Sequence, residues 1–173
     1  MKTFFIMILF ILCCSLSLLS QDVQITQQAP NSVAAPSIDV SNNLVHLSYG
    51  TNLYYYSFGL DGPSTPITSP VKPAPLSYGP YTVSIRANNS TRYITYIDRN
   101  VSLQRYDLLF QKSTDGTVWS TPMVLETIQK SNSISLRPDN PILRTSAKGN
   151  IYCLYLNYSD TNKVFLLRSA NTG

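Results

Sequence analysis

Three serines recur at one fixed spacing in this chain. Ser57, Ser113 and Ser169 each follow the previous one by 56 residues. The segments that begin at the last two, 113–119 and 169–173, resemble one another in sequence. A short motif that recurs about every 50 residues is typical of a radial or solenoid array of similar units. We therefore expect a repeated unit, and we expect the chain to end inside its third copy.

Short strands separated by turn-prone residues fill each expected unit. Apolar and polar residues alternate over a few positions at a time, and ten-residue amphipathic helical patterns are absent. A proline stands near the expected start of each unit, at Pro36, Pro80 and Pro141, where a strand tolerates a residue without an N–H. The expected strands are 37–40, 44–49, 53–57 and 67–71 in the first unit, 82–86, 92–97, 107–113 and 119–125 in the second, and 142–145, 151–156 and 164–169 in the third.

Four antiparallel strands per unit are the plan of a propeller blade. The sequence therefore predicts an all-β fold with about three such blades, which form an incomplete ring. We place the blades at about 36–75, 76–130 and 131–173. Two sheet edges would then lack a neighbour, and such edges favour self-association.

The N-terminal segment is typical of a secretory signal peptide. Lys2 precedes an apolar run over 4–14, and small residues follow up to Ser20. We expect residues 1–20 to be removed, residues 21–35 to form a polar lead-in, and the mature protein to be secreted or at the cell surface, without a membrane span. A membrane anchor and a lipid attached to Cys13 or Cys14 are the alternatives.

The remaining composition argues against several classes of function. The formal net charge is +4, and the chain has no run of Lys and Arg, which is unlike a nucleic-acid-binding protein. His46 is the only histidine, and Cys153 is the only cysteine outside the leader. We expect a buried strand cysteine, no His/Cys metal site and no cofactor.

The segment Ser113-Thr114-Asp115-Gly116-Thr117-Val118-Trp119 resembles the Asp-box, or BNR repeat, of the sialidase superfamily. A second, incomplete box begins at Ser169 and carries Asn171 and Gly173. The resemblance implies a sialidase-type β-propeller, with the box on the hairpin between the third and fourth strands of a blade. It also implies that Ser113, Asp115, Gly116 and Trp119 stabilise the blade and take no part in chemistry.

A sialidase-like active site uses three arginines that bind a carboxylate, a Tyr activated by a Glu, and an acidic residue. Asp39, Arg86 and Arg144 occupy similar places in the three first strands and are the candidate site residues. The Arg-Ile-Pro tripeptide of the family is absent. The only glutamate, Glu126, lies just beyond a fourth strand, so we expect any catalytic Tyr/Glu pair beyond Gly173.

Three functions therefore stay open. The first is a binding module that contacts a glycan or an extracellular protein through Tyr-rich loops. The second is the N-terminal part of an exo-sialidase, and the third is a structural surface protein. Four sequons also predict glycosylation sites in turns, at Asn88, Asn89, Asn100 and Asn157.

Overall fold

The computed structural model describes residues 36–49, 53–61, 82–129, 138–157 and 163–169, and all of its regular structure is β-strand. The expected all-β class is therefore confirmed. The predicted signal peptide, the lead-in and the fourth strand at 67–71 lie outside the described residues. The strands are β1 (Ser37–Ser41), β2 (Leu44–Tyr49), β3 (Tyr54–Gly59), β4 (Val83–Asn88), β5 (Thr91–Asn100), β6 (Arg105–Ser113), β7 (Met123–Gln129), β8 (Pro138–Thr145), β9 (Ile151–Asn157) and β10 (Lys163–Ser169).

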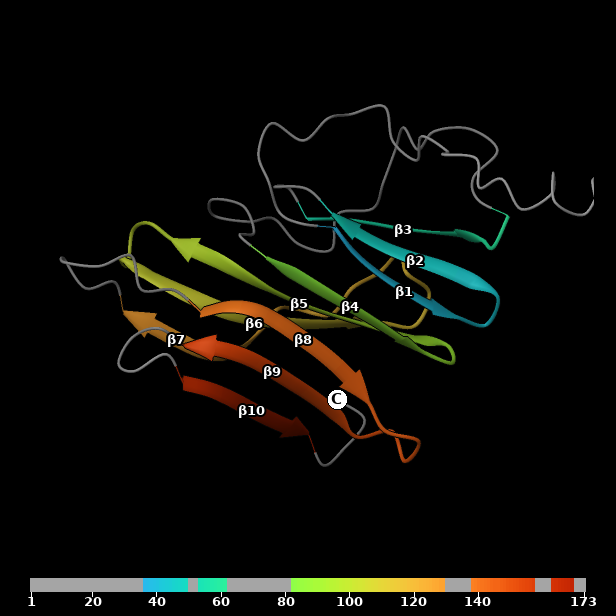
Figure 1. Cartoon of the computed structure of the whole chain (residues 1–173). Coiled ribbons are helices and arrows are strands. Elements are labelled where there is room, and N and C mark those ends of the chain that lie inside the picture. Colours follow the sequence, from blue (N-terminus) through green and yellow to red (C-terminus); the bar gives the residue numbers. More distant parts are fainter. Residues whose placement is uncertain (1–35, 50–52, 62–81, 130–137, 158–162, 170–173) are drawn as a thin grey trace, which may run out of the picture.

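The strands pair in chain order into three antiparallel sheets. Sheet 1 has the order β1-β2-β3, sheet 2 the order β4-β5-β6-β7, and sheet 3 the order β8-β9-β10. The first strand of sheet 2, β4, contacts β1 on one side and β8 on the other. Figure 1 shows the three sheets following one another, with β1, β4 and β8 at neighbouring edges. This is the arrangement of consecutive blades in a partial propeller.

Asparagines at the tight turns explain why the hairpins form where the sequence predicts them. Asn42 and Asn43 connect β1 to β2 with φ values of 51° and 60°, and Asn89 connects β4 to β5 with φ of 51°. Asparagine tolerates the left-handed region better than most residues, because its short amide can bond to nearby backbone groups.

Cross-strand pairing identifies the equivalent residues of the three sheets. In each sheet, the candidate residue of the first strand lies opposite a residue of the second strand, which lies opposite a residue of the third. The rows are Asp39–His46–Ser57, Arg86–Tyr93–Lys112 and Arg144–Tyr152–Arg168.

These rows show that the prediction of three equivalent serines is wrong for Ser57. Ser57 is equivalent to Lys112, whereas Phe58 occupies the position of Ser113 and Ser169. Only the last two serines mark one structural position. The 56-residue interval before them is therefore not a structural repeat, because strand pairing and not chain length sets the register.

Two predicted strand boundaries are wrong. The fourth strand of sheet 2 begins at Met123 and not at Trp119, so Glu126 lies inside β7 and not beyond it. Pro141 lies within β8 and not ahead of it, and the pairing of β8 with β9 is irregular between Asp139 and Ile142. A proline fits there for two reasons. β8 is an edge strand, and the irregular pairing means that no ladder hydrogen bond requires an N–H at this position.

Apolar clusters fill the two junctions between sheets. Between sheets 1 and 2 the buried core contains Leu53, Val83, Ile94 and Tyr96. Between sheets 2 and 3 it is larger, and it is formed by Tyr93, Ile97, Tyr106, Leu108, Phe110, Leu143, Ile151, Cys153 and Tyr155. Each sheet therefore depends on its neighbour for burial of one apolar face.

Candidate binding site

Serine hydroxyls join the innermost strands of neighbouring sheets. The Oγ atom of Ser37 in β1 accepts a hydrogen bond from the backbone N–H of Ile85 in β4, at 3.1 Å. Ser84 of β4 accepts in the same way from the N–H of Leu143 in β8, also at 3.1 Å. The two serines occupy equivalent positions, so one contact repeats at both junctions. It satisfies backbone N–H groups that face a neighbouring edge strand, which would otherwise be costly to bury.

Asp39 and Arg86, two of the three candidate residues, form an ion pair between sheets 1 and 2. Arg86 Nη1 donates to Asp39 Oδ1 at 2.6 Å, and the other carboxylate oxygen accepts from the N–H of Ala87 at 2.6 Å. Arg86 Nε also donates to Thr145 Oγ1 of sheet 3, at 3.4 Å. The side chains of Asp39 and Arg86 are 11% and 33% exposed, so the carboxylate is shielded from water and the guanidinium only in part. One guanidinium thus connects all three sheets.

A pocket of ≈450 Å³ opens where β1, β4 and β8 meet, and we call it the axial pocket. Its polar lining includes Ser37, Asp39, Thr82, Ser84 and Arg144. Arg86 bonds to Asp39 but is not one of the residues that line the pocket. The structure therefore brings all three candidates to one place, with Asp39 and Arg144 at the surface of the pocket.

Arg144 differs from Arg86 in its environment. It is exposed, and its Nη1 atom donates to the carbonyl of its own neighbour Leu143 at 2.7 Å. The remaining N–H groups of a guanidinium form a planar fork that can bond to hydroxyl or carboxylate oxygens. Hydroxyl groups on the other wall of the axial pocket can both donate and accept. This combination suits a polyhydroxylated ligand.

Both carboxylate oxygens of Asp39 are engaged within the protein, because Oδ1 accepts from Arg86 and Oδ2 from the N–H of Ala87. Its role in the axial pocket is therefore to orient Arg86 and the N–H of Ala87. Among the described residues, no group of three or more His, Cys, Asp or Glu side chains is placed to hold a metal ion.

The loop 114–118 connects β6 to β7 and is closed by two polar side chains. Ser113 Oγ donates to Asp115 Oδ1 at 3.0 Å and accepts from the N–H of Gly116 at 2.8 Å. The same Asp115 oxygen accepts from the N–H groups of Thr117 and Val118, at 2.7 and 2.9 Å. The bonds from Val118 and Thr117 hold the pKa of the Asp115 carboxyl far below its ordinary range.

Gly116 and Trp119 pack this loop against sheet 1. Gly116 has φ of 80°, and a Cβ atom placed there would lie 2.7 Å from Cε1 of Tyr55. Trp119 packs edge-on against the same Tyr55 ring, with centroids 5.1 Å apart, and its Nε1 donates to the Gly116 carbonyl at 3.3 Å. The loop 114–118 of sheet 2, together with Trp119, therefore packs closely against the Tyr55 side chain of sheet 1.

Beside Tyr55 lies a buried histidine that was not among the candidate residues predicted from the sequence. His46 Nδ1 is 2.9 Å from the Tyr55 hydroxyl, and Nε2 is 3.2 Å from Ser41 Oγ. Burial, followed by the positive charge of Arg92, lowers the pKa of His46 from its ordinary value of 6.5. A neutral imidazole, donor at one nitrogen and acceptor at the other, fits this position.

The structure also contains a Tyr/Glu contact, although the sequence predicted any such pair beyond Gly173. The Tyr155 hydroxyl of β9 donates to Glu126 Oε2 of β7 at 3.1 Å. Burial, with the nearby Glu126 charge, raises the pKa of Tyr155 above its ordinary value of 10.0. The pair lies away from the innermost strands and connects sheets 2 and 3.

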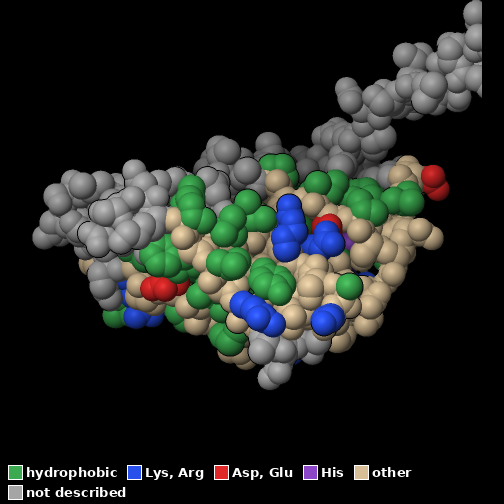
Figure 2. Space-filling model, turned by 60° about the horizontal axis from the view of Figure 1, so that its bottom comes forward, with side chains coloured by type: hydrophobic (Ala, Val, Ile, Leu, Met, Phe, Trp, Pro, Cys, Tyr) green, Lys and Arg blue, Asp and Glu red, His purple; other side chains and the backbone are tan. Residues whose placement is uncertain are grey.

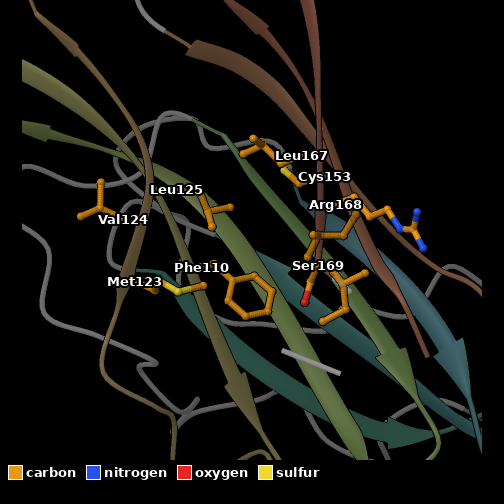
Figure 3. A pocket seen from close by; sticks show the side chains of 10 residues that line it. Phe110, Met123, Val124, Leu125, Cys153, Leu167, Arg168 and Ser169 are labelled. Carbon is orange, nitrogen blue, oxygen red and sulfur yellow. The ribbon is translucent and has the colours of Figure 1, made fainter. Parts of the chain in front are cut away.

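A second pocket of ≈490 Å³ lies between sheets 2 and 3. It is lined by residues of β6 to β10 and by none of β1 or β4. Figure 3 shows Phe110, Met123 and Leu125 of sheet 2 opposite Leu167 and Cys153 of sheet 3, with the Arg168 guanidinium pointing away. Burial raises the pKa of the Cys153 thiol to about 11. The predicted buried cysteine is therefore an inert part of an apolar wall.

The predicted glycosylation sites have different environments. Asn88 is the last residue of β4, and Asn89 lies exposed in the turn that follows. Asn100 ends β5, where its Oδ1 accepts from Ser102 Oγ and the N–H of Leu103, at 2.8 and 3.0 Å. Asn157 ends β9. Asn171 and Gly173 of the second box lie outside the described residues, while Ser169 ends β10.

The part of the chain that the structure describes contains no helix long and apolar enough to cross a membrane.

Comparisons with known proteins support the fold. No family model and no curated protein matches the sequence. An endo-arabinase from Bacteroides thetaiotaomicron superposes with a TM-score of 0.51 at 14% identity, over 88% of this chain and 60% of that one. A GH43 endo-arabinanase from Bacillus licheniformis gives 0.52 at 14% identity, over 86% and 58%.

This chain thus spans about 60% of the length of the first of these structural neighbours. GH43 arabinanases are five-bladed β-propellers. At 14% identity the likeness shows the fold alone. The three sheets of this chain are therefore arranged as blades of a partial β-propeller, as in these neighbours, and the number of blades in a complete ring does not follow from them.

Proposed function

We propose that this protein is a glycan-binding propeller module that binds a saccharide in the axial pocket without cleaving it. The observation that carries the proposal is the convergence of Asp39, Arg86 and Arg144 on the innermost strands of three sheets. Sites in propellers and barrels form where inner strands meet, because loops and strand ends from several sheets contribute side chains there.

Arg144 is the principal ligand-binding group in this proposal. It offers exposed donors for sugar oxygens, while the hydroxyls of Ser37, Thr82 and Ser84 provide a polar wall. The Asp39–Arg86 ion pair keeps this wall in place. The fold of the arabinanases supports a carbohydrate as the ligand class, although fold likeness alone is a weak guide to function.

We further propose that the propeller is of the sialidase type and that the protein is secreted. The hydrogen bonds of Ser113 and Asp115 and the packing of Trp119 support the first point, since they match what an Asp-box turn needs. The five-bladed neighbours do not confirm this type. The pattern of residues 1–20 supports the second point. Its partners would then be extracellular glycans or glycoproteins.

Calorimetric titration of the protein with sialyllactose, arabino-oligosaccharides and neutral cello-oligosaccharides tests the proposal. Arg144→Ala should weaken binding of the preferred saccharide at least tenfold, because a charge-assisted hydrogen bond contributes about 1.5–3 kcal/mol. Arg168→Ala is the matched control, since this exposed arginine lies on the same sheet outside the axial pocket. It should leave affinity unchanged.

Two outcomes oppose the proposal. Equal loss of affinity in both variants would place binding elsewhere on sheet 3. Release of sialic acid or arabinose during incubation would make the protein an enzyme, and the exo-sialidase reading with catalytic groups outside the described residues would replace the binding module.

A further inference from the structure

A third pocket, of ≈480 Å³, lies at the other end of β4 from the axial pocket, and we call it the turn pocket. Two hairpin turns form its walls, 88–91 of sheet 2 and 147–149 of sheet 3. Tyr93, Lys112 and Thr114 of sheet 2 complete the lining. Its volume lies within the range of roughly 300–1,000 Å³ that is typical of small-molecule sites.

Positive charge surrounds the turn pocket. Lys112 lines it from sheet 2 and Lys148 from sheet 3, and both residues are exposed. Arg92 holds the wall between them, because its Nη1 atom donates to the carbonyl oxygens of Ser90 and Thr114, each at 2.6 Å. Both acceptors are uncharged, so these bonds fix the guanidinium next to the pocket without neutralising it.

Negative charge is scarce around the same pocket. None of the described residues that line it is acidic. Asp115 follows Thr114 in the sequence, but its Oδ1 atom accepts from the N–H groups of Thr117 and Val118 within the loop 114–118. The whole chain has 13 Lys and Arg against 9 Asp and Glu, and Figure 2 shows Lys and Arg side chains at several places on one face of the molecule. The electrostatic potential at the turn pocket therefore favours an anion.

Hydrogen bonds within the protein hold both turns in place. In the turn of sheet 3, the carbonyl of Ser146 accepts from the N–H of Gly149 at 2.9 Å, and its Oγ atom accepts from the N–H of Asn150 at 3.1 Å. In the turn of sheet 2, the carbonyl of Asn89 accepts from Asn42 Nδ2 of sheet 1 at 2.6 Å. Because the backbone of both walls is held in this way, a ligand does not have to order it on binding.

The lysines indicate which kind of anion fits best. An ammonium group is a compact charge with three rotatable donors, whereas a planar carboxylate is matched best by the fork of an arginine. A sulfate ester or a phosphate group presents its oxygens in a tetrahedral arrangement, which two separate ammonium groups can approach from different sides. The hydroxyls of Ser90, Thr91 and Thr114 add donors and acceptors for the groups that carry the anion.

We propose that the turn pocket binds the sulfate group of a sulfated saccharide, at a site separate from the axial pocket. Lys112 and Lys148 bind the sulfate oxygens from neighbouring sheets, and the hydroxyls and amides of the turn 88–91 bind the sugar. The proposal does not depend on what the axial pocket binds.

Calorimetric titration of protein made in a bacterial host tests this site, because the predicted glycosylation sites Asn88 and Asn89 line the pocket and carry no glycan there. The probes are a short heparin oligosaccharide, its fully desulfated form and inorganic phosphate. The sulfated probe should bind at least about tenfold more tightly than the desulfated probe, which keeps its carboxylates. Comparable binding of these two probes would contradict the choice of sulfate. Binding of inorganic phosphate as tight as that of the sulfated probe would make a free phosphate the ligand and would overturn the saccharide.

Charge-matched variants locate the binding. Lys112→Ala and Lys148→Ala should each weaken binding of the sulfated probe about fivefold or more, because each removes a charge-assisted hydrogen bond. Lys148→Arg should keep most of the affinity. Arg168→Ala removes the same charge from an exposed position of sheet 3 that lines neither the axial nor the turn pocket, and it should leave the affinity unchanged. Equal losses in Lys148→Ala and Arg168→Ala would show a general attraction to positive charge, and the proposal is then wrong.

Discussion

Truncation of Trp119 to alanine should loosen the junction between sheets 1 and 2. Trp119 is half-buried, so its loss returns about 100 Å² of apolar contact to water, which at about 25 cal/mol per Å² costs about 2.5 kcal/mol. The edge-on pair with Tyr55 adds about 1 kcal/mol beyond burial. We therefore expect the free energy of unfolding to fall by about 3.5 kcal/mol, with a drop in Tm of roughly 7–14 °C for a chain of this size.

Urea unfolding followed by far-UV circular dichroism measures this loss, since Trp119 is the only tryptophan and its fluorescence disappears in the variant. Val118→Ala is the control and should change stability by less than about 0.5 kcal/mol. A double-mutant cycle with Tyr55→Leu isolates the ring pair, with an expected coupling of about 0.5–1.5 kcal/mol. A loss below about 1 kcal/mol, or strict additivity with Tyr55→Leu, refutes the view that this loop binds sheet 2 to sheet 1.

Three further predictions concern the same junctions. Gly116→Ala should destabilise the protein by about 1–3 kcal/mol in urea melts, because φ is positive and the new Cβ meets Tyr55, whereas Gly59→Ala has open space and should be neutral. Because the pKa of His46 is lowered on folding, stability should be highest above pH 6.5 and should fall as the pH drops toward 5, and this slope should be shallower in His46→Gln. Cys153 should not react with a thiol reagent at pH 8 until urea unfolds the protein, and prompt labelling of the native state would contradict its burial.

Local signals in the sequence predicted much of the fold. Alternation and asparagine turns located the first three strands of every sheet to within a few residues, because hairpins with short turns depend on neighbouring residues only. The resemblance to the Asp-box predicted a stabilising role for Trp119, and this side chain packs against Tyr55 of sheet 1.

Features that depend on pairing across sheets escaped the sequence. The equivalence of Phe58, not Ser57, with Ser113 follows from strand register, which the spacing of serines does not encode. The hydrogen bond between Tyr155 and Glu126 joins residues from different sheets, so no local sequence pattern predicts it. His46 looked like an ordinary strand residue, and only burial by the neighbouring sheet reveals its two polar partners.

The candidate site was predictable only in part. Equivalent positions in the first strands pointed to Asp39, Arg86 and Arg144, because inner strands of a propeller meet near its axis. The sequence did not distinguish the three roles. Asp39 and Arg86 neutralise one another between sheets, and Arg144 lies at the surface of the axial pocket.

The most direct test of the axial pocket is a map of backbone amide chemical shifts during titration with the preferred saccharide. The account predicts that the perturbed amides cluster in 36–40, 82–87 and 141–145, the three innermost strands around Arg144. Perturbations confined to the second pocket between sheets 2 and 3, or to the outer strands, would contradict it.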